Sequence, residues 1–232
     1  SEGGESALTL NELRSTALAY RNSQARIVTR EDLIARVYAM PSNFGRVFRV
    51  GVHTNPNNPL AVTMSIVSRD SSGKLVDRYS SGNLVIAPDA LKESLSLYLN
   101  QYRLISDAID IVDAQVINVG IDYGVVIDAV SNKNLTIQNI NKALQTYMSI
   151  ENFQIDQPIM TSDLVSLIIH TTGVVSLVNF TVKNITGTVD GRVYSSSAFS
   201  VPYNTDRGII IPPPGSIFEL KYKNDDIVGF AR

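Results

Sequence analysis

The stretch "QVINVGIDYGVVIDA", residues 115–129, decides the fold that we expect for this chain. Apolar residues alternate with small or polar ones along it, which is the period of a β-strand with one buried face. Gly120 and Gly124 fall on the other face, where the lack of a side chain lets another backbone approach closely. The stretch predicts a long, half-buried strand whose apolar face needs a cover: Ile117, Val119, Ile121, Tyr123, Val125 and Ile127.

Two amphipathic helices follow the strand and can supply that cover. The first spans residues 136–148, with Asn134 expected to cap it, and the second is the apolar "SDLVSLIIH", residues 162–170, with a cap among residues 161–163. Because elements adjacent in sequence usually pack together, we expect Leu164 and Ile168 to lie buried against the strand. A second strand, residues 174–182, can join the same sheet through Val174, Val178, Phe180 and Val182.

The N-terminal half is expected to be a separate group of helices and strands. A helix is predicted over residues 10–22, and another begins after Thr29, whose hydroxyl can form a capping box with Asp32. Strands are predicted at residues 46–54 and 60–70, around turn-rich "NPNNP". The clearest helix spans residues 91–102, because its apolar residues form one stripe: Leu91, Leu95, Tyr98, Leu99 and Tyr102.

The order of these elements predicts an α+β fold with small mixed sheets packed by amphipathic helices, because strands and helices do not alternate regularly. We expect two or more sub-domains: residues 1–106, a strand-helix-helix-strand unit at 107–183, and a β-rich segment at 184–232. The chain opens with the linker-like "SEGGES" and lacks an initiating methionine, so we expect a fragment of a longer protein.

Composition excludes several classes of function. The chain has 232 residues, 44% of them apolar and 18% charged, which is typical of a folded domain. A formal net charge of −2 without a basic stripe argues against nucleic-acid binding. The absence of cysteine excludes disulfides, thiolate metal sites and cysteine catalysis. No apolar run has the length of a membrane span, so we expect no membrane association.

No motif in the sequence indicates catalysis. Neither a Gly-x-Ser-x-Gly turn nor a phosphate-binding loop is present, and His53 and His170 have no cluster of other metal ligands near them in sequence. The acidic run Asp107–Asp113 lacks the spacing of a calcium loop. The "KNDD" of residues 223–226 is most simply a surface turn. We therefore expect no enzyme activity, cofactor, metal or small-molecule ligand.

Two segments carry a resemblance to a known family. "QARIVTREDLIARVYAMP" is similar to an R-x-V-T-x-x-D segment through Arg26, Val28, Thr29 and Asp32. "QPIMTSDLVSLIIHTTGVVSLVNFTV" is similar to a later block through five positions: Ser162, Leu164, Ile168, Gly173 and Val174. With the elements between them, residues 10–183 resemble the baseplate J-like family of contractile phage tails and related injection machines, and in particular the C-terminal part of T-even-like baseplate wedge subunits.

This resemblance implies a structural protein of the virion, assembled in the host cytoplasm. Such subunits join their neighbours into a ring around the tail hub, and the ring rearranges when the sheath contracts. It implies self-association as a homodimer, contacts with other wedge proteins and no cofactor. Leu164, Ile168 and Val174 are then candidates for the core or for an interface, with Thr29 and Asp32 as a structural cap.

Two alternatives stay open at the level of the sequence. One is an enzyme or enzyme accessory domain on the same fold, with carboxylates of Asp107–Asp113 in a cleft. The other is a receptor- or carbohydrate-binding tail domain, because the segment Gly191–Gly208 is rich in tyrosine and serine. An exposed aromatic shelf favours the binding domain, and a deep polar pocket favours the enzyme.

Overall fold

The computed structural model describes residues 27, 29–54, 58, 61–70, 72–76, 89–102 and 108–232. Its helices and small mixed sheets confirm the α+β class. The chain divides into two compact units, residues 1–78 with 85–114 and residues 79–84 with 115–232. Within the described residues no helix has both the length and the hydropathy of a membrane span. The helix predicted over residues 10–22 lies outside the described residues.

The described residues of the first unit form a three-stranded sheet with two α-helices. Strand β1 (Arg49–Thr54) pairs antiparallel with β2 (Ala61–Val67), and β2 pairs parallel with β3 (Ala108–Asp113). The connection from β2 to β3 runs through α3 (Asp89–Asn100), as a parallel pair requires a crossover. Four residues of the predicted stripe are buried on α3: Leu91, Leu95, Tyr98 and Leu99. They share one core with Met64 and Ile66 of β2, and Tyr102, beyond the end of α3, is half-buried against it.

Helix α2 (Arg30–Tyr38) begins with the residues that the sequence marked as its cap. The backbone N–H of Asp32 donates to the Thr29 hydroxyl at 3.1 Å, and the N–H of Thr29 donates to the Asp32 carboxylate at 3.0 Å. These two bonds satisfy donors that a helix start otherwise leaves unpaired. A 3₁₀ turn, η1 (Ser42–Phe44), follows and ends at Gly45, whose φ of 101° suits glycine.

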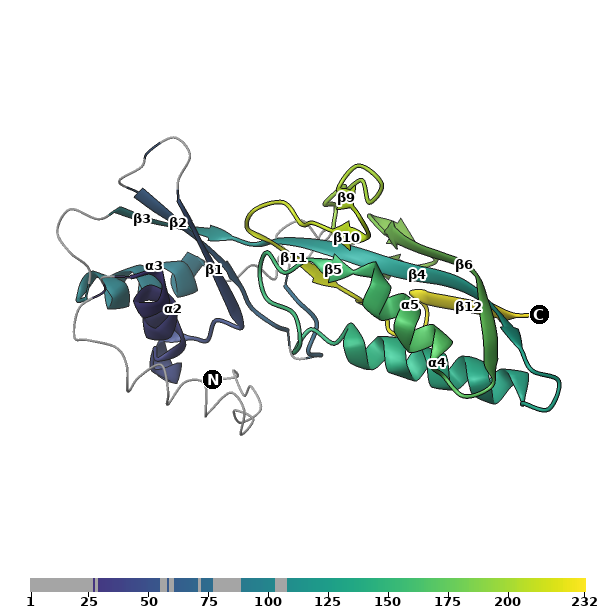
Figure 1. Ribbon diagram of the computed structural model, residues 1–232. Coiled ribbons are helices and arrows are strands. Elements are labelled where there is room, and N and C mark those ends of the chain that lie inside the picture. Colours follow the sequence, from purple (N-terminus) through teal and green to yellow (C-terminus); the bar gives the residue numbers. More distant parts are fainter. Residues whose placement is uncertain are drawn as a thin grey trace. The chain divides into compact units, whose positions relative to one another are not determined.

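The second unit is organised around β4 (Gln115–Ile127), the strand that the alternation predicted. Strand β6 (Val174–Asn184) pairs antiparallel with it, and β11 (Ser216–Glu219) and β12 (Ile227–Ala231) both pair parallel with it. The backbone N–H of Gln115 donates to the carbonyl of Gly215, just before β11, and the N–H of Ile121 donates to the carbonyl of Asp226, just before β12. The odd-numbered residues of β4 therefore form their backbone hydrogen bonds on the side of β11 and β12. These two strands therefore follow one another along one edge of β4, and β6 occupies the other edge (Figure 1).

Helices α4 (Lys133–Tyr147) and α5 (Thr161–Ile169) cover one face of this sheet (Figure 1). α5 packs on α4 and β6, and α4 also packs on β12. All six residues of the predicted apolar face of β4 are buried, and the Tyr123 hydroxyl reaches α4 to donate to Asn141 Oδ1 at 2.7 Å. The expectation of a half-buried strand was wrong, because Asn118, Gly120 and Gly124 of the other face are buried as well. Leu164 and Ile168 are fully buried on α5.

The helix caps of this unit differ from those that the sequence predicted. Asn132, rather than Asn134, caps α4, because its Oδ1 accepts from the N–H groups of Asn134 and Leu135. α5 has no side-chain cap. The Thr161 hydroxyl instead donates to the carbonyl of Gly208, which joins the start of α5 to the turn between two short strands, β9 (Thr205–Asp206) and β10 (Ile209–Ile210).

Strand β6 joins the sheet of β4 as predicted, but its alternation is interrupted. The register with β4 shifts twice, so that Val178 and Val175 have no opposite residue and Leu177 takes a place beside Val125. Val175 and Val178 are exposed at 62% and 47%, whereas Val182 is buried and Val174 is half-buried. The prediction that Val178 belongs to the inward face was wrong, because two β-bulges each displace one valine.

The segment after residue 184 belongs to the same compact unit as β4. Its strands are short: β7 (Thr188–Val189) pairs with β8 (Arg192–Val193), and β10 pairs with both β9 and β5 (Ile159–Met160). Strands β11 and β12 then complete the sheet of β4. Strands β11 and β12 lie beyond the sub-domain boundary that we expected near residue 184, yet they pair with β4, which lies before it.

Candidate functional site

A network of buried polar groups lies at the start of β4, where the C-terminal segment crosses the sheet. The Tyr194 hydroxyl donates to Asp226 Oδ1 at 2.6 Å, and the backbone N–H of Tyr222 donates to Asp226 Oδ2 at 2.7 Å. Asp226 is 2% exposed and Tyr194 is 3% exposed. The expectation of a surface turn at residues 223–226 was therefore wrong for Asp226, because its carboxylate is buried and accepts hydrogen bonds from the Tyr222 backbone and the Tyr194 side chain.

A second part of this network is centred on Asn118 of β4. Its Nδ2 donates to Glu219 Oε2 at 2.8 Å, and its Oδ1 accepts from the backbone N–H of Ser195 at 2.7 Å. Asn184 donates to the Asn118 carbonyl and accepts from the N–H of Phe199. These bonds join β4, β6, β11 and the connection between β8 and β9, so the network holds the C-terminal segment against β4.

The electrostatics of the network fit a structural role. Burial raises the pKa of Asp226, and its hydrogen bonds from Tyr194 and the Tyr222 backbone oppose that rise. Burial also raises the pKa of the Tyr194 hydroxyl, and the bond to Asp226 adds to that effect. A buried carboxylate costs free energy unless donors surround it, and here two donors do so. The groups bond to one another rather than pointing into a cavity.

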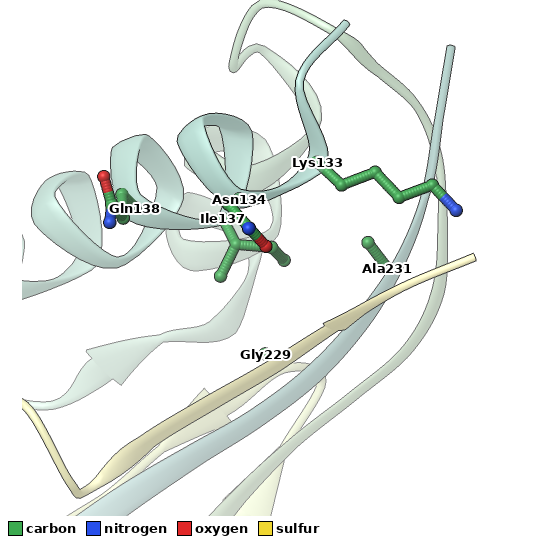
Figure 2. A pocket seen from close by; sticks show the side chains of 6 residues that line it. All are labelled: Lys133, Asn134, Ile137, Gln138, Gly229 and Ala231. Carbon is green, nitrogen blue, oxygen red and sulfur yellow. The ribbon is translucent and has the colours of Figure 1, made fainter. Parts of the chain in front are cut away.

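A shallow hollow lies between the start of α4 and β12 (Figure 2). Figure 2 shows Lys133, Asn134, Ile137 and Gln138 of α4 over Gly229 and Ala231 of β12. The lining holds one cation, two amides and no carboxylate, imidazole or hydroxyl. These six residues do not supply a nucleophile and base pair, so the hollow has no evident chemistry.

The face of the sheet away from the helices is only partly covered. Residues Ile185 and Ser195 lie over its first half, at Gly120 and Asn118. In the second half, the Phe230 ring of β12 lies over Gly124. A Cβ atom at position 124 would overlap both this ring and the side chain of Asn179. Phe230 is nevertheless 43% exposed and Val228 is 52% exposed. This exposed half-face, together with the neighbouring edge strand β6, is the candidate interaction surface of the second unit.

The remaining residues that the sequence singled out do not converge on one site. Asp113 pairs with Lys92 at 2.6 Å in the first unit, and Asp107 lies outside the described residues. His170 ends α5 and its Nδ1 lies 2.8 Å from the Ser166 carbonyl oxygen. In the part of the chain that the structure describes, no three His, Cys, Asp or Glu side chains are grouped to hold a metal ion.

Sequence reasoning missed the residues of the polar network. The alternation of β4 places Asn118 on the polar face of the strand without indicating a partner, and residues 223–226 predict only a surface turn. Their partners lie far along the chain, at Ser195, Glu219 and Tyr194. A signal that could have found them is the amide of Asn118, because its neighbours on the same strand face, Val116 and Gly120, carry no polar side chain.

No protein-family model and no curated protein matches this chain. A solved structure does: a chain of the cryo-EM structure of the anti-feeding prophage (AFP) baseplate, six-fold symmetrised, superimposes with a TM-score of 0.53 and 12% sequence identity. The two chains share a fold. The similarity covers 94% of this chain and 43% of the baseplate chain, so this chain spans less than half of the length of its structural neighbour.

Proposed function

We propose that this chain is a structural component of a contractile-tail baseplate, part of a wedge subunit that joins its neighbours into a ring around the tail hub. One observation carries the proposal: the chain shares its fold, over 94% of its length, with a chain of a six-fold symmetrised prophage baseplate. The resemblance of the segments around Thr29 and Leu164 to the baseplate J-like family supports it independently of that superposition.

The arrangement of the second unit supports an assembly role. Its central strand is paired on both edges, and a buried polar network fixes the C-terminal segment to it. A rigid sheet with an exposed half-face can transmit displacement between neighbours without unfolding. In this proposal the subunit self-associates, contacts other wedge proteins, resides in the virion tail and moves as the ring rearranges on sheath contraction.

The proposal includes no catalytic step, cofactor, nucleic acid or membrane. An enzyme built around the acidic run is disfavoured by the pairing of Asp113 with Lys92, and the six residues that line the hollow on α4 include no carboxylate, imidazole or hydroxyl. The two histidines lie in different compact units. The structural role accounts for the described polar groups without assigning any of them to a reaction.

A receptor- or carbohydrate-binding role for the segment Gly191–Gly208 is the second candidate, and the geometry does not favour it. Tyr194 and Phe199 are buried, with Phe199 packed edge-on against Phe218 at 5.5 Å between ring centroids. Tyr203 is 88% exposed, but a single ring does not form a shelf on which a sugar can stack. The aromatic residues of this segment mainly anchor it to the sheet.

Deletion of the coding sequence tests the proposed function. In the organism that encodes the chain, we expect its loss to abolish assembled contractile tails, with free tubes or incomplete particles seen by electron microscopy. A copy supplied in trans should restore them. Normal particles in the deletion strain would contradict the proposal, and particles that assemble but fail to attach to cells would favour the binding role.

A further inference from the structure

We propose that β6 is a self-pairing edge, through which the second units of two copies of this chain join antiparallel about a two-fold axis at Thr181. The proposal deepens the self-association part of the proposed function by naming the surface and the register.

The outer edge of β6 carries backbone groups that its own sheet does not use. Odd-numbered residues of β4 bond toward β12, so its even-numbered residues bond toward β6. Their partners in β6 are Asn179, Thr181 and Lys183. The residues between them, Phe180 and Val182, therefore direct their N–H and C=O groups away from β4, and no other described residue bonds to that edge.

The strand has little of what normally protects an edge. Native sheets guard exposed strands with charge, proline, bulges or a covering segment. β6 has eleven residues, "VVSLVNFTVKN", with no proline and with Lys183 as its one charged residue. That lysine is bound to Asp122 of β4 at 2.8 Å. The two bulges lie at Val175 and Val178, which leaves the stretch from Asn179 to Asn184 as the regular segment.

A second copy is the occupant that this segment fits. A two-fold axis at Thr181 places Phe180 of each copy opposite Val182 of the other, so all of the outward N–H and C=O groups of both residues find partners. The side chains then form compatible cross-strand pairs: Thr181 meets Thr181, Phe180 meets Val182 and Asn179 meets Lys183. No like charges face each other, and the same patch serves both copies, as an isologous interface requires.

Cysteine substitution tests the register directly, because the chain contains no cysteine of its own. Thr181 would form a non-hydrogen-bonded antiparallel pair, in which the two Cα atoms lie about 4.5 Å apart, within the range that a disulfide accepts. We expect full-length Thr181→Cys to form a disulfide dimer in a glutathione buffer. The matched control Asn179→Cys should stay uncrosslinked, because its two copies would be offset by roughly 13 Å along the strands.

Charge substitution at the same position tests the pairing in solution. By sedimentation at micromolar concentrations we expect a wild-type dimer, loss of the dimer in Thr181→Lys and in Thr181→Asp, and its return when the two variants are mixed. Val228→Lys, an exposed position on the other edge strand, should remain dimeric. Circular dichroism verifies that each variant is folded.

Three results would overturn the proposal: a monomeric wild-type chain, a dimer that Thr181→Lys does not weaken, or equal crosslinking at residues 179 and 181. A dimer insensitive to both charge variants places self-association on another surface. These outcomes are separate from the proposed function. A chain that is monomeric yet found in assembled baseplates refutes only the β6 pairing, and a β6 dimer absent from baseplates refutes only the baseplate role.

Discussion

Replacing Ile168 with alanine tests whether α5 covers the sheet of its own chain. Ile168 is fully buried on α5, which packs on α4 and β6. The substitution removes the outer carbons of the side chain, which corresponds to about 2.4 kcal/mol at ~0.8 kcal/mol for each buried carbon. The cavity that remains adds to the loss, and such substitutions cost about 2–5 kcal/mol in total. We expect the free energy of unfolding to fall by about 3 kcal/mol.

The neighbouring residue supplies a matched control. Ile169 is 44% exposed on the same helix, and we expect Ile169→Ala to cost less than about 1 kcal/mol in the same urea titration followed by circular dichroism. Ile168→Asp should prevent folding of the second unit, because its charge would have no partner in the core. Equal losses at residues 168 and 169 would refute the reasoning. So would an Ile168→Asp chain of normal stability that fails only to self-associate.

Substitutions at Thr29, Gly124 and Asp226 probe other elements. Thr29→Ala should lower the free energy of unfolding by about 1 kcal/mol in a denaturant titration, with Thr29→Ser close to wild type, since the capping bond needs only a hydroxyl. Gly124→Ala should destabilise the chain in a thermal melt, because its Cβ would overlap the Phe230 ring, and Phe230→Ala should partly restore it. Burial raises the pKa of Asp226 above its ordinary 3.8, so the stabilisation from its protonated form is present below that pH and is lost as pH rises through the raised pKa. In Asp226→Asn, the free energy of unfolding should fall less as pH rises from 3.8 through the raised pKa of Asp226. An unchanged pH profile of the free energy of unfolding would show that another group causes the fall.

Much of the second unit could be predicted because its signals are local. The alternation from Ile117 to Ile127 needs only the two-residue period of a strand, and Leu164 and Ile168, four positions apart, lie on one face of their helix. The capping box at Thr29 is likewise contained in four residues. These local patterns predict the structure correctly because the residues that form each of them are close together in the sequence.

The features that sequence reasoning missed depend on distant or irregular partners. Val178 follows the two-residue period, but a bulge against β4 turns it outward, and nothing within β6 marks the bulge. Asn134 and Asn132 are equally good caps by residue type, and the chosen start of α4 decides between them. Asp226 is buried with the Tyr194 hydroxyl as a donor, and Tyr194 lies 32 positions earlier in the chain. Propensity and period cannot supply these pairings.

Locating the chain within purified particles tests the central claim most directly. The full-length protein would be produced with a peptide tag in the organism that encodes it, and the tag would be labelled with gold for electron microscopy of purified contractile tails. A baseplate component predicts label at the baseplate end of every tail, in symmetric multiple copies, before and after sheath contraction. Label along the fibres or at their tips, or particles without label, would contradict the account.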